Sequence, residues 1–189
     1  NIRQDVFEQF KYNPEEFIRK AANLINDEKA TTIIDGITYN KTDDKFGNEI
    51  FTKNNLNGKL GVNALKVKKH IFDYVITDST IEMEFAKKLE QGEVTIYAKL
   101  PNGFKIRTPF GNYNPDWALV FDNKDIKYIY FVAETKGSMQ SAQLKGAEQG
   151  KIACARKHFK AISNGTVKYG VVDSYENLIN LVTGVVPIE

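Results

Sequence analysis

Two carboxylates and an amine lie at the ends of neighbouring β-prone segments of the sequence. Asp116 precedes one apolar segment, and the next such segment leads into Glu134, Thr135 and Lys136. Period-two alternation puts Glu134 and Lys136 on the same face of a strand. Charges on an otherwise apolar strand are costly unless they pair with each other or bind a metal ion. The spacing therefore indicates either an ion pair or a metal site.

These groups suit a hard divalent cation such as Mg²⁺. Because Mg²⁺ prefers oxygen ligands and keeps several waters, the candidate ligands are Asp116, Glu134 and the backbone carbonyl of Thr135. A metal ion here polarises a phosphoryl oxygen and lowers the pKa of its bound water, which favours phosphodiester hydrolysis. Lys136 would orient that water or offset charge on the phosphate. The alternative is a surface pair of Glu134 and Lys136 on an edge strand, because both short patterns are common by chance.

Glu82 is a third candidate acidic residue, on a helix predicted over residues 79–90. It shares one helical stripe with three apolar residues, Phe85, Ala86 and Leu89. If that stripe faces the sheet, the carboxylate of Glu82 points inward too. The pattern Ser79-x-x-Glu82 also fits a capping box, in which the carboxylate serves the start of the helix. The sequence leaves both roles open.

A second predicted helix, over residues 142–161, is rich in cations. It carries Lys145, Lys151, Arg156, Lys157 and Lys160 against one acid, Glu148. Such a face could neutralise DNA phosphates, although an ordinary solvated helix face is the simpler explanation for most of these residues. Lys151 is the strongest exception because it lies nearest the candidate site. Ser138 and Gln140, just beyond Lys136, are candidates for a phosphate contact or for helix capping.

The elements that must position these groups alternate between helix and strand. β-prone segments cover residues 71–76, 94–98, 104–108, 117–121, 128–133 and 166–172, and helical patterns cover 79–90, 142–161 and 174–181. This order predicts an α/β fold with a mixed central sheet flanked by helices. A capped helix is predicted to begin at Asn13 and Pro14. We otherwise expect residues 1–65 to form a small, irregular N-terminal extension, with the main domain over residues 66–189.

Composition limits the remaining possibilities. A chain of 189 residues fits one domain with a small appended part. Its single cysteine excludes an internal disulfide framework. With a net charge of only +2, any nucleic-acid surface must be a local patch. The sequence contains no secretory signal and no long apolar run, which predicts a cytoplasmic protein that does not enter a membrane.

Longer motifs extend the pattern. They are Asp78-Ser79-x-x-Glu82-x-x-Phe85-Ala86-x-x-Leu89, then Lys99-Leu100-Pro101, then Thr108-Pro109-x-Gly111-x-Tyr113-Asn114-Pro115-Asp116-Trp117-Ala118, then Glu134-Thr135-Lys136-Gly137, and finally Lys151-Ile152-x-Cys154 with Lys157-His158-Phe159. In this order they resemble the endonuclease domain of type III restriction enzyme Res subunits, within the PD-(D/E)XK nuclease family. The resemblance spans residues 72–172.

The resemblance implies a restriction-endonuclease-like core that cuts double-stranded DNA with Mg²⁺. By this likeness Asp116 and Glu134 bind the metal, Lys136 is catalytic and Glu82 is a supporting acidic residue. It also implies an upstream motor domain that uses ATP, joined through residues 1–65, and a Mod methyltransferase subunit that reads the DNA site. The first residue is not Met, which fits a domain cut from a longer protein. One alternative is a nuclease-like module that binds DNA or a partner subunit without cutting, and another is the same nuclease chemistry in repair or recombination.

Overall fold

A four-stranded mixed sheet organises the main body of the molecule. The computed structural model describes residues 4–43, 45–51, 58–123, 126–133, 146–163 and 167–184. The sheet has the strand order β3 (Ile96–Lys99), β6 (Trp117–Asn123), β7 (Ile126–Ala133) and β8 (Val167–Val171). Its first three strands are antiparallel neighbours, whereas β8 runs parallel to β7. A parallel pair needs a crossover connection, and α4 (Gly146–Ile162) lies in that connection.

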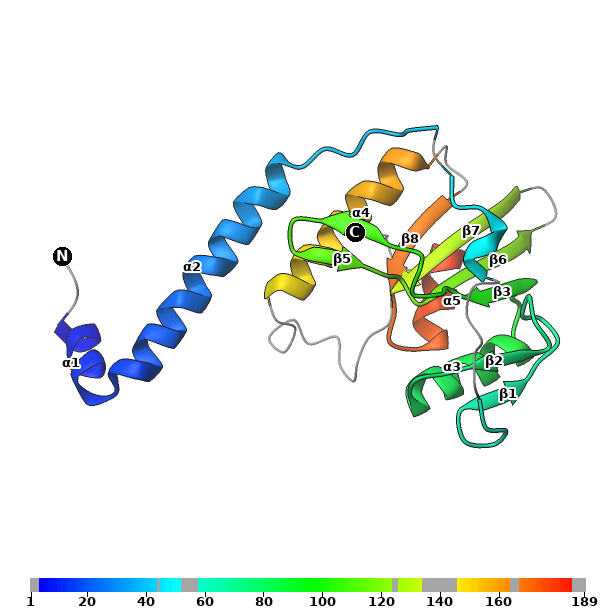
Figure 1. Cartoon of the computed structure of the whole chain (residues 1–189), viewed down its shortest axis with the longest axis horizontal. Helices are drawn as coiled ribbons and strands as arrows, with labels where there is room; N and C mark the ends of the chain where they lie inside the picture. Colours follow the sequence, from blue (N-terminus) through cyan, green and yellow to red (C-terminus); the bar gives the residue numbers. More distant parts are fainter. Residues whose placement is uncertain are drawn as a thin grey trace.

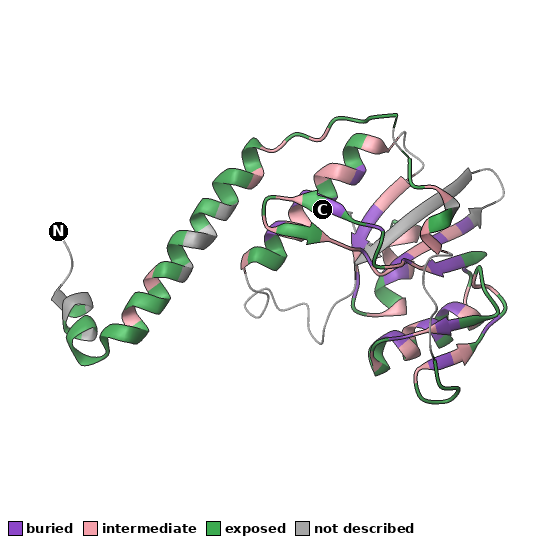
Figure 2. Ribbon diagram, in the orientation of Figure 1, coloured by how far each residue is buried: buried purple, intermediate pink, exposed green. Residues whose placement is uncertain are grey.

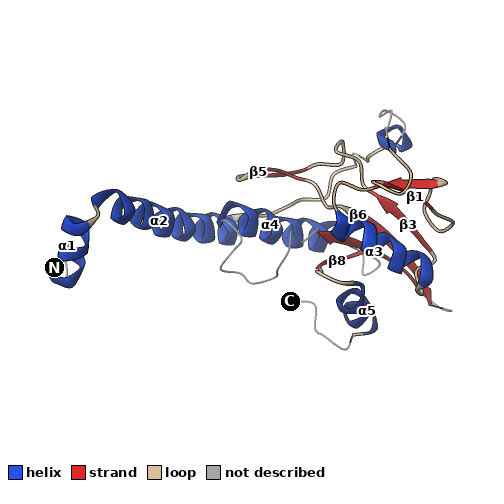
Figure 3. Ribbon diagram, turned by 90° about the horizontal axis from the view of Figure 1, so that it is seen from below, coloured by secondary structure: helices blue, strands red, loops and turns tan. Residues whose placement is uncertain are grey.

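Helices lie on both faces of this sheet. α3 (Thr80–Gln91) and α5 (Tyr175–Thr183) are on one side, and α4 is on the other. Figure 3 shows α4 and α5 on opposite sides of β8. The predicted α/β class is therefore confirmed. None of the helices in the described ranges is long and apolar enough to cross a membrane.

Two apolar clusters match the two faces. Under α3 and α5, strand alternation buries Trp117, Leu119 and Phe121 together. The cluster under α4 contains Leu100, Phe104, Ile106, Ala155, Phe159 and Tyr169. Cys154 of α4 is also buried, as its apolar neighbours predict. Period-two and helical spacing thus sort the side chains onto the expected sides.

Two small hairpins complete the body. They are β1 (Ala64–Lys66) with β2 (Tyr74–Ile76), and β4 (Ile106–Thr108) with β5 (Gly111–Tyr113). The strand expected over residues 71–76 is therefore limited to its last part. The strand expected over residues 104–108 does not join the four-stranded sheet, because it pairs with β5 instead. Gly111 has φ +101°, which a residue with a side chain rarely adopts, and begins β5 immediately after the turn.

The N-terminal part is more helical than the sequence suggests. It contains α1 (Gln4–Tyr12), α2 (Pro14–Gly36) and the 3₁₀ turn η1 (Asn48–Phe51). The predicted cap is confirmed, since Asn13 Oδ1 accepts a hydrogen bond from Glu16 N at 3.0 Å. α2 extends from the main body as an arm (Figure 1), and most of its described side chains are exposed (Figure 2).

One lysine of the main body fixes the inner end of this arm. Lys157 Nζ of α4 donates hydrogen bonds to the carbonyls of Ile34, Asp35 and Ile37, at 2.6, 3.1 and 3.2 Å. A cation is favourable at these last carbonyls of a helix, which have no partner within it. The expectation of an irregular segment was wrong for residues 31–36, because this contact supports a helix through a β-branched run that is unfavourable by itself.

Candidate active site

Asp116 lies at the end of the sheet where β6 begins beside the last residues of β7. Its backbone carbonyl accepts a hydrogen bond from Leu100 N at 2.7 Å, which extends the β3–β6 pairing by one residue. The next residue, Trp117, pairs with Val132 of β7. Asp116 is thus at the same sheet end as Ala133, the residue that precedes Glu134 in the chain.

The side chain of Asp116 belongs to the face covered by α4. Opposite residues of an antiparallel pair share a face, and Leu100, opposite Asp116, lies in the apolar cluster under α4. The pKa values of two tyrosines in the same cluster, Tyr113 and Tyr169, support this placement. Burial is the main cause that raises the pKa of Tyr113, and the charge of Asp116 contributes to the rise. Asp116 acts in the same direction on the pKa of Tyr169, whose rise is also mainly due to burial.

The two tyrosines bond each other beside Asp116. Tyr113 of β5 and Tyr169 of β8 have their hydroxyl oxygens 2.9 Å apart. Because their pKa values are raised, both phenols stay neutral near pH 7. Their rings and hydroxyls therefore form an uncharged wall next to the carboxylate.

The first half of α4 covers the hairpin that carries Tyr113. A Cβ on Gly150 would lie 2.7 Å from the ring of Phe110, so the helix backbone approaches the hairpin turn closely. Lys151 is half-buried, and its Cε lies 3.8 Å from the position of a Cβ on Gly111. The structure thus places Lys151 against the same hairpin, and its predicted contact with a DNA phosphate stays a prediction.

Glu82 is held on the other face of the sheet, under α3. Its side chain is 3% exposed, and its Oε2 accepts hydrogen bonds from Asp78 N at 2.7 Å and Lys99 Nζ at 2.6 Å. Glu82 N donates to Ser79 Oγ, so the Ser79 half of the capping box is present. The carboxylate returns to Asp78 N instead of Ser79 N. Both open roles are therefore partly realised, because Glu82 serves the start of the helix and also points inward.

Lys99 is the residue of this cluster that the sequence interpretation missed. Its Nζ also contacts Asp78 Oδ2 at 2.6 Å, and its side chain is only 16% exposed. Burial by itself would lower the pKa of Lys99, but the bonds to Asp78 and Glu82 outweigh it and raise the pKa. The sequence did contain one signal for it: Lys99 is two positions after the buried Tyr97, so both side chains lie on the same face of β3. Its partners, far away in the sequence, left no signal.

Lys99 connects this cluster to the end of the sheet that carries Asp116. It pairs with Trp117 across β3 and β6, and its neighbour Leu100 bonds the Asp116 carbonyl. Its own backbone N–H donates to His70 Nε2 at 3.1 Å. Glu82 and Asp116 are therefore linked through β3, but they approach the sheet from opposite faces.

Five predicted site residues lie outside the described ranges. They are Glu134, Thr135, Lys136, Ser138 and Gln140. Within those ranges there is no group of three or more His, Cys, Asp or Glu side chains that could hold a metal ion. Two of the three predicted metal ligands are among the five, so the metal site stays a prediction. The half-buried carboxylate of Asp116 is of the oxygen type that Mg²⁺ binds.

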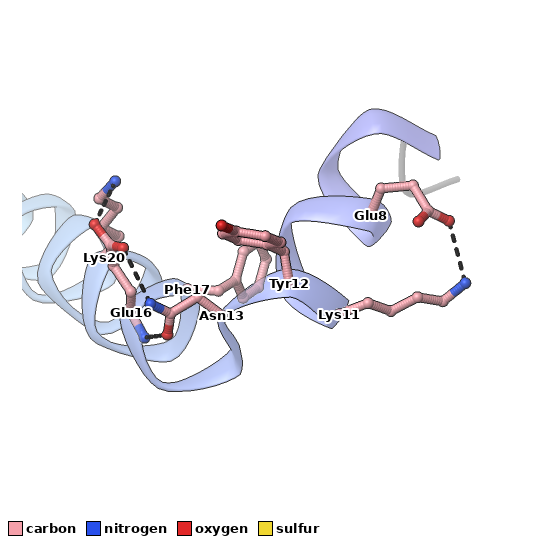
Figure 4. A pocket seen from close by; sticks show the side chains of 7 residues that line it. All are labelled: Glu8, Lys11, Tyr12, Asn13, Glu16, Phe17 and Lys20. Atoms are coloured by element: carbon pink, nitrogen blue, oxygen red, sulfur yellow. Dashed lines mark hydrogen bonds and ion pairs between the residues drawn. The ribbon is translucent and has the colours of Figure 1, made fainter.

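A hollow of about 710 Å³ lies away from these residues, at the elbow between α1 and α2. Figure 4 shows that its charged side chains pair with one another. Lys11 contacts Glu8 at 3.1 Å, and Lys20 contacts Glu16 at 2.9 Å. Because these charges are satisfied locally and largely exposed, the elbow offers no distinct chemistry.

Comparison with known proteins places the chain in a family. The sequence profile of a family described as an endonuclease domain matches residues 68–175, more than half of the chain, and the chain belongs to this family. Two curated relatives are the Res subunits of the type III restriction-modification enzymes EcoPI, from Escherichia phage P1, and EcoP15I, from Escherichia coli. Each is 28% identical over 121 residues, which is 62% of this chain and 12% of the relative. No solved structure matches the chain.

Proposed function

We propose that this domain hydrolyses phosphodiester bonds of double-stranded DNA as the cleavage part of a type III Res subunit. The observation that carries this proposal is the position of Asp116. It lies at the end of the sheet where β7 also ends, and Glu134-Thr135-Lys136 follow β7 directly in the chain. Membership of the endonuclease-domain family and the likeness to two Res subunits support the same conclusion. The proposal includes a PD-(D/E)XK core formed by the sheet with α3 and α4.

Three oxygen donors would hold Mg²⁺ in this domain: the carboxylates of Asp116 and Glu134 and the carbonyl of Thr135. The bound ion would supply Lewis-acid activation of water and of the phosphate. Lys136 would stabilise negative charge that develops on the phosphoryl oxygens. Lys151, Ser138 and Gln140 would bind neighbouring phosphates and hold the strand in register.

Glu82 has a supporting role in this proposal. Its carboxylate fixes Lys99, the last residue of β3, and Lys99 pairs with Trp117. Leu100, directly after β3, bonds the carbonyl of Asp116. Glu82 would thus position the metal-binding carboxylate through the end of β3, since catalytic groups must be held within a fraction of an ångström. It is a positioning residue that acts through Lys99.

The rest of the assembly follows from the relatives and is proposed with the domain. The chain matches 12% of each Res subunit, and a motor domain that uses ATP would occupy part of the remainder. A Mod methyltransferase subunit would provide sequence recognition. Residues 1–65 would connect the motor to the nuclease, and the complex would act in the cytoplasm.

Nicking of supercoiled plasmid with Mg²⁺ or Mn²⁺ tests the function. The wild-type chain should nick, and Asp116→Asn should reduce the rate by about a hundredfold to a thousandfold, because it removes one charged group of the reaction centre. Asp73→Asn, an exposed residue within the matched range, is the control and should nick like the wild type.

Equal nicking by Asp116→Asn and wild type would refute the assigned site. Without any nicking, the same variants should be compared in the full ATP-dependent complex. DNA binding without cleavage even there would favour the module that binds without cutting.

A further inference from the structure

The second half of α4 and the start of β8 form a basic hollow of about 550 Å³. It is lined by Arg156, Lys157, Phe159, Lys160, Ser163, Val167, Lys168 and Tyr169. Half of these residues are cationic, and none of the described lining residues is acidic. This basic hollow is distinct from the α1–α2 elbow, where each cation named above has an acidic partner.

The cations of the basic hollow differ in their contacts and in their exposure. Lys157 is engaged with the carbonyls at the end of α2. Arg156 and Lys160 have exposed side chains, and Lys168 is half-buried on β8. The charge of Arg156 reaches the floor of the hollow, where it opposes the burial that raises the pKa of Tyr169. A concave surface with one sign of charge concentrates the field and attracts an anion.

The aromatic floor indicates which part of a nucleic acid would bind. The rings of Phe159 and Tyr169 stack on each other with centroids 5.2 Å apart and an interplanar angle of 11°. Both are buried, with 1% and 5% exposure, and the Tyr169 hydroxyl already bonds Tyr113. The rings therefore do not offer a free face to an unpaired base, which is what single-strand recognition by stacking needs. Phosphate groups suit this surface better than bases.

The distance to the candidate active site fits one DNA duplex. Nine residues of α4 separate Lys151 from Lys160, about 14 Å along the helix. On β8, three residues separate Lys168 from Val171, the partner of Ala133, or about 10 Å. Phosphates follow one another every ~3.4 Å of axis on each strand. The basic hollow and the candidate active site are therefore about three to four base pairs apart.

We propose that the basic hollow binds the phosphate backbone of duplex DNA a few base pairs from the bond that is cut. The inference rests on the proposed DNA-cleaving function, but the contact itself requires no metal and none of residues 134–136. Arg156, Lys160 and Lys168 carry it, and Lys157 fixes the position of the arm beside it. The hollow would hold the duplex in place while the other sheet end performs hydrolysis.

Duplex binding in EDTA tests the contact separately from catalysis. The probe is a fluorescent 30-base-pair duplex, titrated by anisotropy over a range of salt concentrations. The triple variant Arg156→Gln, Lys160→Gln and Lys168→Gln should weaken binding about tenfold or more at ~0.1 M salt, and should reduce the slope of log affinity against log salt by about two to three. Lys59→Gln, Lys66→Gln and Lys87→Gln together change the net charge equally on exposed residues and serve as the control.

The outcomes separate this contact from the proposed function. Equal weakening in both triple variants would overturn the contact, because it would then reflect net charge alone. Unchanged binding by a folded hollow variant, checked by its thermal unfolding midpoint, would also overturn it. Loss of binding in the hollow variant alone supports the contact, whether or not the wild type nicks plasmid.

Discussion

Glu82 and Asp116 lie at the same end of the sheet, but their surroundings differ. Glu82 is almost fully buried and bonds a half-buried lysine and a backbone N–H. Asp116 is half-buried and stands beside two neutral tyrosines, on the face of α4. The first arrangement fixes a carboxylate in one place, and the second leaves a carboxylate partly exposed to solvent.

In the proposed function, Glu82 is a stabilising acid and Asp116 a reactive one. A buried charge must keep its partner, because an unpaired ion in the interior is far more costly than one in water. A half-buried carboxylate can exchange partners at a much lower cost. Changes around Glu82 should therefore appear mainly in stability, and changes at Asp116 mainly in cleavage.

The largest expected effect on stability comes from Lys99→Met. This change keeps an unbranched side chain but removes the cation that the buried Glu82 contacts, and we expect it to lower the free energy of unfolding by about 3–5 kcal/mol. Urea denaturation followed by circular dichroism measures the loss. Lys87→Met is a matched control, because Lys87 contacts Glu84 at the same 2.6 Å but on an exposed surface. Its loss should stay below about 1 kcal/mol.

A double variant sharpens this prediction. Glu82→Leu combined with Lys99→Met removes both charges, so it should recover part of the stability lost in Lys99→Met alone. If Lys99→Met is no more harmful than Lys87→Met, the buried pair does not hold this end of the sheet.

Asp116→Asn should behave in the opposite way. We expect its free energy of unfolding to stay within about 1 kcal/mol of wild type, because the substitution conserves shape and the backbone bond to Leu100 N. Urea denaturation of the variant that is used for plasmid nicking checks this. A loss as large as that of Lys99→Met would mean that Asp116 is itself a structural acid and does not differ from Glu82 in this respect.

The sequence was informative where structure depends on neighbours along the chain. Ser79 caps α3 as the capping-box pattern predicts, the helical pattern over residues 174–181 matches α5, and Trp117 is buried by strand alternation. Asp116 was also placed correctly at a strand start, because a Pro-Asp pair precedes an apolar run. Such features need only propensity, capping and period.

Features that depend on distant partners were missed. The ion pair between Glu82 and Lys99 joins residues 17 positions apart, and neither residue marks the other in the sequence. β4 was misplaced for another reason: its partner β5 is the next segment of the chain, and strand propensity does not distinguish pairing within a short hairpin from pairing with the sheet. The length of α2 depends on Lys157, which follows it by more than a hundred residues.

The pH dependence of the Lys99 cluster gives the smallest expected effect. The pKa of Lys99 is raised above its ordinary value of 10.5, so the native state binds this proton more tightly than the unfolded chain does. Its stabilisation is fully present below pH 10.5 and is lost as the pH rises through the native pKa. The stability difference between wild type and Lys99→Met should therefore be constant from pH 7 to 10 and shrink above 10.5.

Urea denaturation of both proteins between pH 7 and 11.5 measures this difference. Tyr113 and Tyr169 also have raised pKa values, so both proteins should lose stability above pH 10 for that shared reason. Only the difference between the curves reports Lys99. A difference that stays constant up to pH 11.5 would show that the effect of Lys99→Met arises from packing, with no contribution from the charge that holds Glu82.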